Sequence, residues 1–463
     1  MLINALSLSG IHPDMDTPPV VPGRAAPHVT PVLAEAGQFM RSSGTQAAGA
    51  GATQSAYFAE LDGVAYRVKL NPPDRLTNTF HEVLSARLLN DIGLHVNPPS
   101  AWVVDEGEIW VASRVIPNAR DLGPYLLHAA GEQATRPGKP GREAGEALAR
   151  YRELDGLKQS LSASDAIRPL LEKYRKGGFD QLTASEHAAL QPLRDVARHM
   201  LQVQEQILDL LPQGRALRSS LLTAAYAGEV VGEWDFLNDL RFNTMVYQDE
   251  AGGIHVQTVD RGVSGPVGFG GELKEKCEER ANQPAKISDP YASANAAESF
   301  YLPGMFSRRD MDFRKPSPSA GLIGSIPRSA SSAFIFKDVI RNEREHLVLQ
   351  PDTGSKARLA PQGMPEEALQ VAWLLKHRAD PQMVARSIAA ACNECRRHPA
   401  TRAMLRPEVM GAADARALAA LYNARIQAII ARAEEGGALN RWANRNPAQA
   451  RRILMDGALG GAV

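Results

Sequence analysis

The chain has few cysteines, no net charge and no long apolar run. Its 463 residues include three cysteines, Cys277, Cys392 and Cys395, too few for a disulfide framework in a chain of this length, which favours a reducing site of action. Lysine plus arginine and aspartate plus glutamate each number 52, so the composition gives no reason to expect a nucleic-acid partner. No apolar run reaches the roughly 20 residues that span a bilayer, so we expect a soluble protein without a transmembrane segment.

The first 38 residues lack the pattern of a general secretory signal. MLINALSLSG is mildly amphipathic, without a basic region followed by a continuous apolar stretch, and a proline-rich segment comes next. We therefore expect residues 1–38 to form a disordered leader. Such a leader is either a signal for a specialised secretion system or an ordinary flexible tail.

Two β-hairpins are predicted near the start of the body of the chain. Turn signals at Asp62-Gly63 and Glu106-Gly107 separate runs that are rich in β-branched and aromatic residues. The predicted strands are 54–61, 64–70, 100–105 and 108–116. Lys69 comes near the end of the second strand, where its ammonium group could reach phosphates.

A glycine-rich segment, SSGTQAAGAGATQS at 42–55, precedes the first hairpin. Its Gly44, Gly49 and Gly51 would let backbone amides approach an anion closely. A glycine- and alanine-rich linker has the same composition, so both interpretations stay open.

One helix is predicted between the two hairpins. Asn78 or Thr79 can cap it, its apolar face runs to about Ile92, and Gly93 ends it. Glu82 lies in its first turns. This carboxylate would either pair with Lys69 and fix the ammonium over phosphates, or remain solvated and complement the helix dipole.

An acidic loop and a second acidic turn follow much later, in VGEWDFLNDLRFNTMV at 231–246 and HVQTVDRG at 255–262. The β-prone runs on either side of a turn at 249–253 predict a hairpin, which would place Asn243 and Asp260 at the same end. Aspartate and asparagine supply the hard oxygen ligands that Mg²⁺ prefers. An ordinary hairpin with polar residues at its mouth would have the same pattern.

The order of these features resembles that of the protein-kinase-like superfamily. The chain is similar to the atypical branch that contains HipA, actin-fragmin kinase and type II phosphatidylinositol 4-kinases. HEVLSARLLNDIGLHVNPPSAWVV at 81–104 is especially similar to the glutamate helix and following strand of that branch, and the resemblance covers roughly residues 40–275. It implies an α+β, two-lobed protein-kinase-like fold with a small antiparallel-sheet N-lobe and a mainly helical C-lobe.

The resemblance also implies ATP and Mg²⁺ as cofactors, with a role for each site residue. Lys69 would contact phosphate beneath the glycine segment, and Glu82 would pair with Lys69. Asp235 would be the catalytic acid or base, and Asn243 and Asp260 would bind Mg²⁺.

The sequence departs from the family pattern at three places. It has no HRD triplet, and Arg261 replaces the usual apolar residue after the metal-binding aspartate. Asp235 precedes Asn243 by eight positions instead of the common five. Asp239, only four positions before Asn243, is therefore the alternative catalytic carboxylate.

Four parts of the chain are expected on this basis. They are a leader at 1–38, an N-lobe at 39–118, a C-lobe at 119–340 with an insertion and a mobile segment, and a helical C-terminal extension at 341–463. The insertion is expected at about 130–184, where GEQATRPGKPGREAG is typical of a loop. After it, helices are expected at about 185–211 and 215–227. In the extension, Cys392, Cys395 and His398 suggest either zinc ligands or, from their helical surroundings, a packed helix.

The expected activity is ATP/Mg-dependent transfer of a phosphoryl group to a protein Ser/Thr acceptor. A phosphoinositide kinase, an AMP transferase and a catalytically inactive kinase-like interaction protein remain alternatives. A leader joined to such a body resembles bacterial type III or type IV effectors. The expected location is therefore a host cell, with a host protein or phosphoinositide as substrate and a host activator as a further partner, or otherwise the bacterial cytoplasm.

Overall fold

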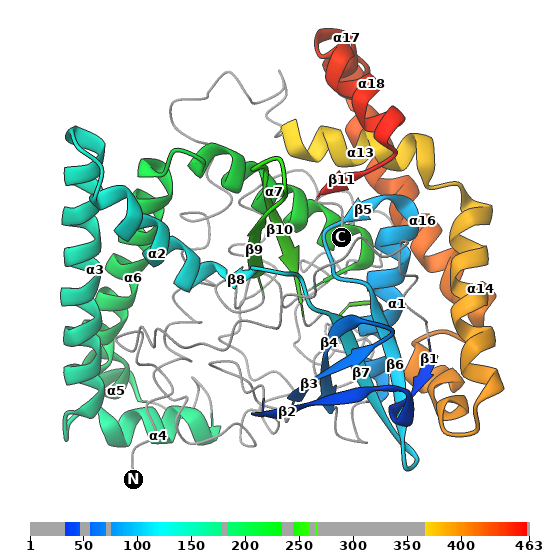
Figure 1. Cartoon of the computed structure of the whole chain (residues 1–463), viewed down its shortest axis with the longest axis horizontal. Helices are drawn as coiled ribbons and strands as arrows, with labels where there is room; N and C mark the ends of the chain where they lie inside the picture. The colour runs from blue at the N-terminus through cyan, green and yellow to red at the C-terminus, as the bar shows by residue number, and fades with distance from the viewer. Residues whose placement is uncertain are drawn as a thin grey trace.

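The described part of the chain is an α+β structure, mostly helical, with a small mixed sheet (Figure 1). The computed structural model describes residues 33–46, 56–70, 76–177, 183–233, 244–259, 264–266 and 366–460. Among these residues, no helix combines the length and apolarity needed to cross a bilayer.

The main sheet has six strands in the order β1-β6-β7-β4-β3-β2. Their bounds are β1 Leu33–Glu35, β2 Met40–Gln46, β3 Ala56–Leu61, β4 Val64–Leu70, β6 Ser100–Asp105 and β7 Glu108–Arg114. Both predicted hairpins are confirmed, as β3–β4 and β6–β7. Their turn residues, Asp62-Gly63 and Glu106-Gly107, all have positive φ, which matches the right-handed twist of paired strands.

One edge of this sheet differs from the prediction. β1 pairs in parallel with β6, so the sheet is mixed, whereas a purely antiparallel sheet was predicted. The sheet also begins at Leu33, inside the segment assigned to the leader, and the 3-10 helix η1 (Ala36–Gln38) leads on to β2. A strand of three residues is too short for alternation to reveal it, and Ala34 is buried only through its tertiary neighbours.

Helix α1 (Leu76–Ile92) crosses one face of the main sheet. Most of its residues are buried, and the ring of Phe80 stacks on that of Trp102 with centroids 5.7 Å apart. The indole Nε1 of Trp102 donates a hydrogen bond to the carbonyl oxygen of Thr79 at 2.9 Å. A surface helix buries one apolar face, whereas α1 is covered on nearly all sides. Its position is therefore fixed by tertiary packing.

Two smaller sheets connect distant parts of the chain. β8 (Arg120–Asp121), β9 (Thr244–Gln248) and β10 (Ile254–Thr258) form the first, in the order β10-β9-β8. The predicted hairpin around 249–253 is thereby confirmed. In the second, β11 (Leu459–Gly460) pairs in parallel with β5 (Leu94–His95).

A layer of helices follows the main sheet. These are α2 Leu122–Ala134, α3 Lys139–Ala163, α4 Arg168–Gly177, α5 Ala184–Ala189, α6 Gln191–Leu210 and α7 Gly214–Val231. In Figure 1, α3 and α6 lie side by side at one end of the molecule. The predicted helices at 185–211 and 215–227 are present, although the first is divided at Leu190 into α5 and α6.

The loop predicted within the insertion is wrong, because much of that segment belongs to α2 and α3. Pro140 lies in the first turn of α3, where its missing N–H breaks no intrahelical hydrogen bond. A Cβ at Gly141 would overlap the carbonyl oxygen of Arg136. The glycine that suggested a loop is therefore required by close packing where the chain turns from α2 into α3.

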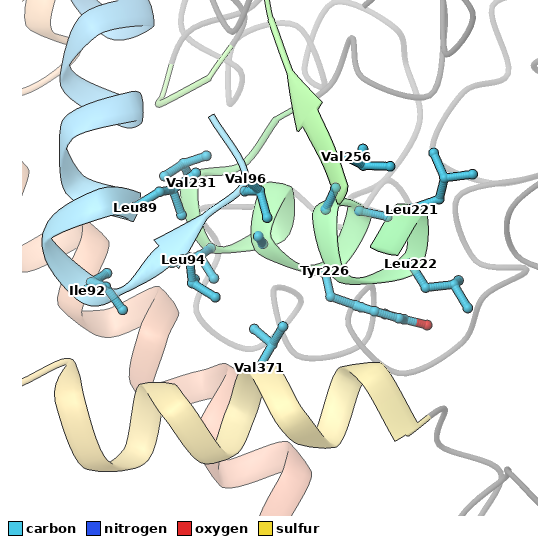
Figure 2. Packing of buried hydrophobic residues seen from close by; sticks show 14 of the residues in the cluster. Leu89, Ile92, Leu94, Val96, Leu221, Leu222, Tyr226, Val231, Val256 and Val371 are labelled. Atoms are coloured by element: carbon cyan, nitrogen blue, oxygen red, sulfur yellow. The ribbon is translucent and has the colours of Figure 1, made fainter. Parts of the chain in front are cut away.

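The C-terminal helices pack into the same core as α1 and α7. They are α13 Glu366–Arg378, α14 Pro381–Arg397, α15 Pro407–Met410, α16 Ala415–Glu434, α17 Ala438–Arg445 and α18 Pro447–Asp456, with 3-10 turns η7 Thr401–Leu405 and η8 Glu435–Gly437. Figure 2 shows Val371 of α13 pointing into this core, toward Leu94 and Tyr226. The C-terminal helices were predicted to pack against the second lobe. They also contact α1, which was not predicted.

Candidate functional site

Lys69 and Glu82 form a buried ion pair between β4 and α1. The Nζ atom of Lys69 donates to Oε2 of Glu82 at 2.8 Å and to Oε1 at 3.0 Å. The two side chains are only 10% and 7% exposed. The interpretation of Glu82 as a solvated carboxylate is therefore wrong, and the predicted pairing is present.

The sheet positions Lys69 by alternation. Val68 packs into the small core on one face of the sheet, whereas Val111, the cross-strand neighbour of Lys69, belongs to the core that contains α1. Neighbouring residues on a strand point to opposite faces, so Lys69 points toward α1. β4 lies between β3 and β7, and hydrogen bonding on both edges fixes the strand that carries the lysine.

The stability of the fold alone does not explain a buried ion pair of this kind. Removing two charges from water costs several kcal/mol each, and apolar replacements of similar volume are often neutral or stabilising. Of the Lys, Arg, Asp and Glu residues of β4 and α1, Lys69 and Glu82 are the two that are buried, beside other polar residues such as His81 and Ser85. The pair is therefore a candidate functional site.

The predicted catalytic and metal-binding residues lie outside the described residues. These are Asp235, Asp239, Asn243 and Asp260, in the segments 234–243 and 260–263. Their positions at one end of the hairpin stay a prediction, but the described residues that flank both segments are close together.

Three contacts join the ends of these segments. Thr244 and Thr258 are cross-strand partners in β9 and β10. On the other side, Ser264 Oγ donates to Oε2 of the buried Glu233 at 2.6 Å, and the amide of Gly265 donates to the carbonyl oxygen of Val231 at 2.8 Å. The two segments that carry the acidic residues therefore start and end at shared anchor points.

The short segment 264–266 also touches α1. Gly265 has φ +82°, and a Cβ there would overlap the ring of His81, the residue before Glu82. The His81 ring is fully buried and packs edge-on against Phe80 with centroids 5.1 Å apart. Only glycine fits this position, so the backbone at 264–266 rests against the helix that carries Glu82.

Asn97 fastens the hairpin to the chain that follows α1. Its Nδ2 donates to the carbonyl oxygen of Thr258 at 2.7 Å and to Thr258 Oγ1 at 3.1 Å. Thr258 in turn bonds Val96 through its amide, at 2.7 Å, and through its hydroxyl, at 3.1 Å. Thr258 precedes Asp260 by two residues, so this network fixes the strand that leads into the predicted metal-binding turn.

The glycine segment is only partly described. Gly44 belongs to β2, where the register with β3 shifts between Arg41 and Gln46, so a loop at that residue was wrong. β2 lies two strands from β4, about 10 Å away at the usual strand spacing. Gly49 and Gly51, between β2 and β3, lie outside the described residues.

The alternative zinc site in the C-terminal part is not supported. Cys392 and Cys395 are buried in α14, and burial raises the pKa of the Cys392 thiol to about 11 and that of Cys395 further still. Nδ1 of His398 accepts a hydrogen bond from the amide of Ala400 at 3.2 Å. Within the described ranges, no group of three or more His, Cys, Asp or Glu side chains could hold a metal ion.

No known protein family, curated protein or solved structure matches this chain. The case for a function therefore rests on the pair and the anchored segments described above. Sequence reasoning missed His81, Asn97, Glu233 and Ser264 as parts of this arrangement. A signal was present for the first, because His81 stands in a helix whose other inward residues are mostly apolar.

Proposed function

We propose that the protein is a kinase of two-lobed, protein-kinase-like fold that uses ATP and Mg²⁺ to phosphorylate a protein Ser/Thr acceptor. The single observation that carries this proposal is the buried Lys69–Glu82 pair, joining the strand and helix on which the sequence resemblance placed them. The main sheet with α1 would be the N-lobe. The hairpin β9–β10 and the helices around α7 would be the C-lobe.

Phosphoryl transfer needs mainly positioning and neutralisation of charge. Glu82 would hold the Lys69 ammonium against phosphate oxygens, and Asn243 and Asp260 would hold Mg²⁺ on the segments anchored at Thr244 and Thr258. The acceptor hydroxyl would attack the γ-phosphorus as its bond to the ADP oxygen breaks. The hydroxyl proton would pass to Asp235, or to Asp239 if that residue is the base.

The acceptor and location are inferred from the sequence alone. The predicted N-terminal leader, shortened by β1 from Leu33 onward, and the atypical body resemble effectors that act in a host cell, which favours a host protein as acceptor. A phosphoinositide acceptor, transfer of AMP and a pocket without catalysis are alternative outcomes of the same experiment.

The test uses the full-length protein and three variants. Lys69→Met and Asp260→Ala are each incubated with Mg²⁺ and ATP labelled at the γ- or the α-phosphate, with host-cell lysate or phosphoinositide vesicles as acceptors. Lys173→Met is the matched control, because it breaks a half-exposed Lys173–Glu186 pair of 2.7 Å far from this site in sequence. We expect γ-label on protein with the wild type and the control, and none with the other two variants.

Other results would have definite meanings. Label on lipid would change the acceptor, and label from the α-phosphate would identify AMP transfer. Absence of both transfer and Mg-dependent nucleotide binding in the wild type would overturn the kinase proposal and favour an interaction protein.

A further inference from the structure

Helix α1 is held by the C-terminal part of the chain as well as by the sheet. α13, α14, α15 and η7 all contact it. Oγ of Ser387 in α14 donates a hydrogen bond to Oδ2 of Asp91, in the last turn of α1, at 2.5 Å. These contacts cover the side of α1 turned away from the sheet.

The chain also fastens the end of α1 through its backbone. The amide of Leu459 donates to the carbonyl oxygen of Gly93 at 2.7 Å, and β11 then pairs with β5 immediately after the helix. Gly93 and Gly460 have φ +98° and +92°, and a Cβ on either would overlap a carbonyl oxygen of the opposite segment. This close pairing therefore depends on glycine on both sides.

Arg378 braces the same junction from α13. Its guanidinium lies against Gly457, whose left-handed backbone (φ +61°) ends α18 and turns the chain into β11. We call the residues from Gly457 to Gly460, together with Arg378 and Ser387, the clamp. Ser387 and the 457–460 segment meet α1 or the residues that directly follow it, and Arg378 supports them through Gly457.

The position of α1 decides whether Glu82 reaches Lys69. Glu82 lies roughly 16 Å along the helix axis from Gly93, at 1.5 Å per residue. A tilt of about 10° at the Gly93 end would move Glu82 by about 3 Å, the length of the ion pair. In protein kinases, the position of the helix that carries the glutamate determines whether the lysine–glutamate pair forms.

We propose that the clamp holds α1 in the orientation that keeps Glu82 paired with Lys69, so the pair is assembled within the chain. The catalytic consequence rests on the proposed function, whereas the clamp itself does not. Under this proposal the site needs neither phosphorylation nor a host activator to bring the pair together. The C-terminal helices act as positioning elements for a site to which they contribute no reacting group.

Lys69 itself can report on the clamp. The full-length protein is treated with a small amine-acylating reagent, and modification of Lys69 over time is measured by mass spectrometry. Gly460→Ala places a methyl group against the carbonyl oxygen of His95. Gly107→Ala is the matched control, because Gly107 has nearly the same φ, +90°, with no atom near the added methyl.

We expect Gly460→Ala to raise the rate of Lys69 acylation at least tenfold and to speed hydrogen exchange in 76–92. Gly107→Ala should stay within twofold of the wild type in both measurements. Ser387→Ala removes one hydrogen bond and leaves the backbone unchanged, and it should raise acylation of Lys69 by about threefold. This variant still tests the clamp if Gly460→Ala does not fold.

Unchanged acylation of Lys69 in both Gly460→Ala and Ser387→Ala would overturn the clamp. Nucleotide binding, measured in parallel, keeps the two proposals apart. If the wild type binds no Mg-nucleotide but the variants expose Lys69, the clamp stands and the kinase proposal fails. If the wild type binds Mg-nucleotide and Lys69 is as well protected in the variants as in the wild type, the clamp fails and the kinase proposal stands.

Discussion

The ion pair of Lys69 and Glu82 allows a quantitative test of why it is there. At 2.8 Å and an effective dielectric of 20, the attraction between the two charges is about 6 kcal/mol before desolvation is counted. Both side chains are almost fully buried, so removing one partner deprives the other of this counter-charge at a site shielded from water. We expect Lys69→Met or Glu82→Leu alone to cost about 3–5 kcal/mol.

The double variant should behave differently. Met and Leu would fill the same space with apolar groups, and neither of these two charges would then remain buried. We expect the Lys69→Met/Glu82→Leu protein to lie within about 1 kcal/mol of the wild type, or to be more stable. The coupling free energy between the two sites would therefore be at least about 5 kcal/mol, because two single losses of about 3 kcal/mol or more would shrink to about 1 kcal/mol or less in the double variant.

Native-state hydrogen exchange of the α1 amides is the appropriate assay, because it reports the opening free energy of this region. Each single variant should exchange faster by a few hundred- to a few thousandfold, since about 1.4 kcal/mol corresponds to a factor of ten. The double variant should return close to the wild-type rate. Additive losses would refute the reasoning, since they would mean that the two sites are not energetically coupled.

Three further predictions concern the surroundings of the site. Asn97→Ala should lower the opening free energy of the β9–β10 hairpin by about 1–3 kcal/mol in hydrogen exchange, because the buried Thr258 loses the hydrogen bonds that Asn97 donates to its carbonyl oxygen and hydroxyl. Burial lowers the pKa of His95 below 6.5, so the unfolded chain binds a proton first; thermal stability should fall as pH decreases through 6.5, and His95→Gln should flatten that dependence. Cys392 and Cys395 should resist alkylation at pH 7.5 until the protein unfolds, because burial raises both pKa values; rapid labelling of the native protein would contradict this packing.

Local signals in the sequence were enough to predict the strand that carries Lys69 and the helix that carries Glu82. Asp62-Gly63 and Glu106-Gly107 predicted tight turns because few other residue pairs adopt two successive positive φ values. The helix that carries Glu82 was predicted to within a few residues, ending before Gly93. The pairing of Glu82 with Lys69 was expected only through the resemblance, and its burial could not be derived from one helix and one strand.

Long-range packing explains what the sequence did not reveal. β1 and β11 are strands of three and two residues, which have no periodicity of their own. Gly141 was misread because a glycine required by close approach looks the same as a glycine in a loop. Asn97 became visible as part of the site only when the structure brought Thr258 beside it.

The pairing of β5 with β11 has a consequence for how the chain is made. At 5–20 residues per second, the ribosome needs roughly 20–70 seconds to synthesise the residues between these two strands. During that time Leu89 and Ile92 lack the C-terminal helices that cover them in the finished core. We expect the N-terminal half to remain a chaperone client until synthesis is nearly complete, and nascent chains that stop before α13 to be sensitive to protease.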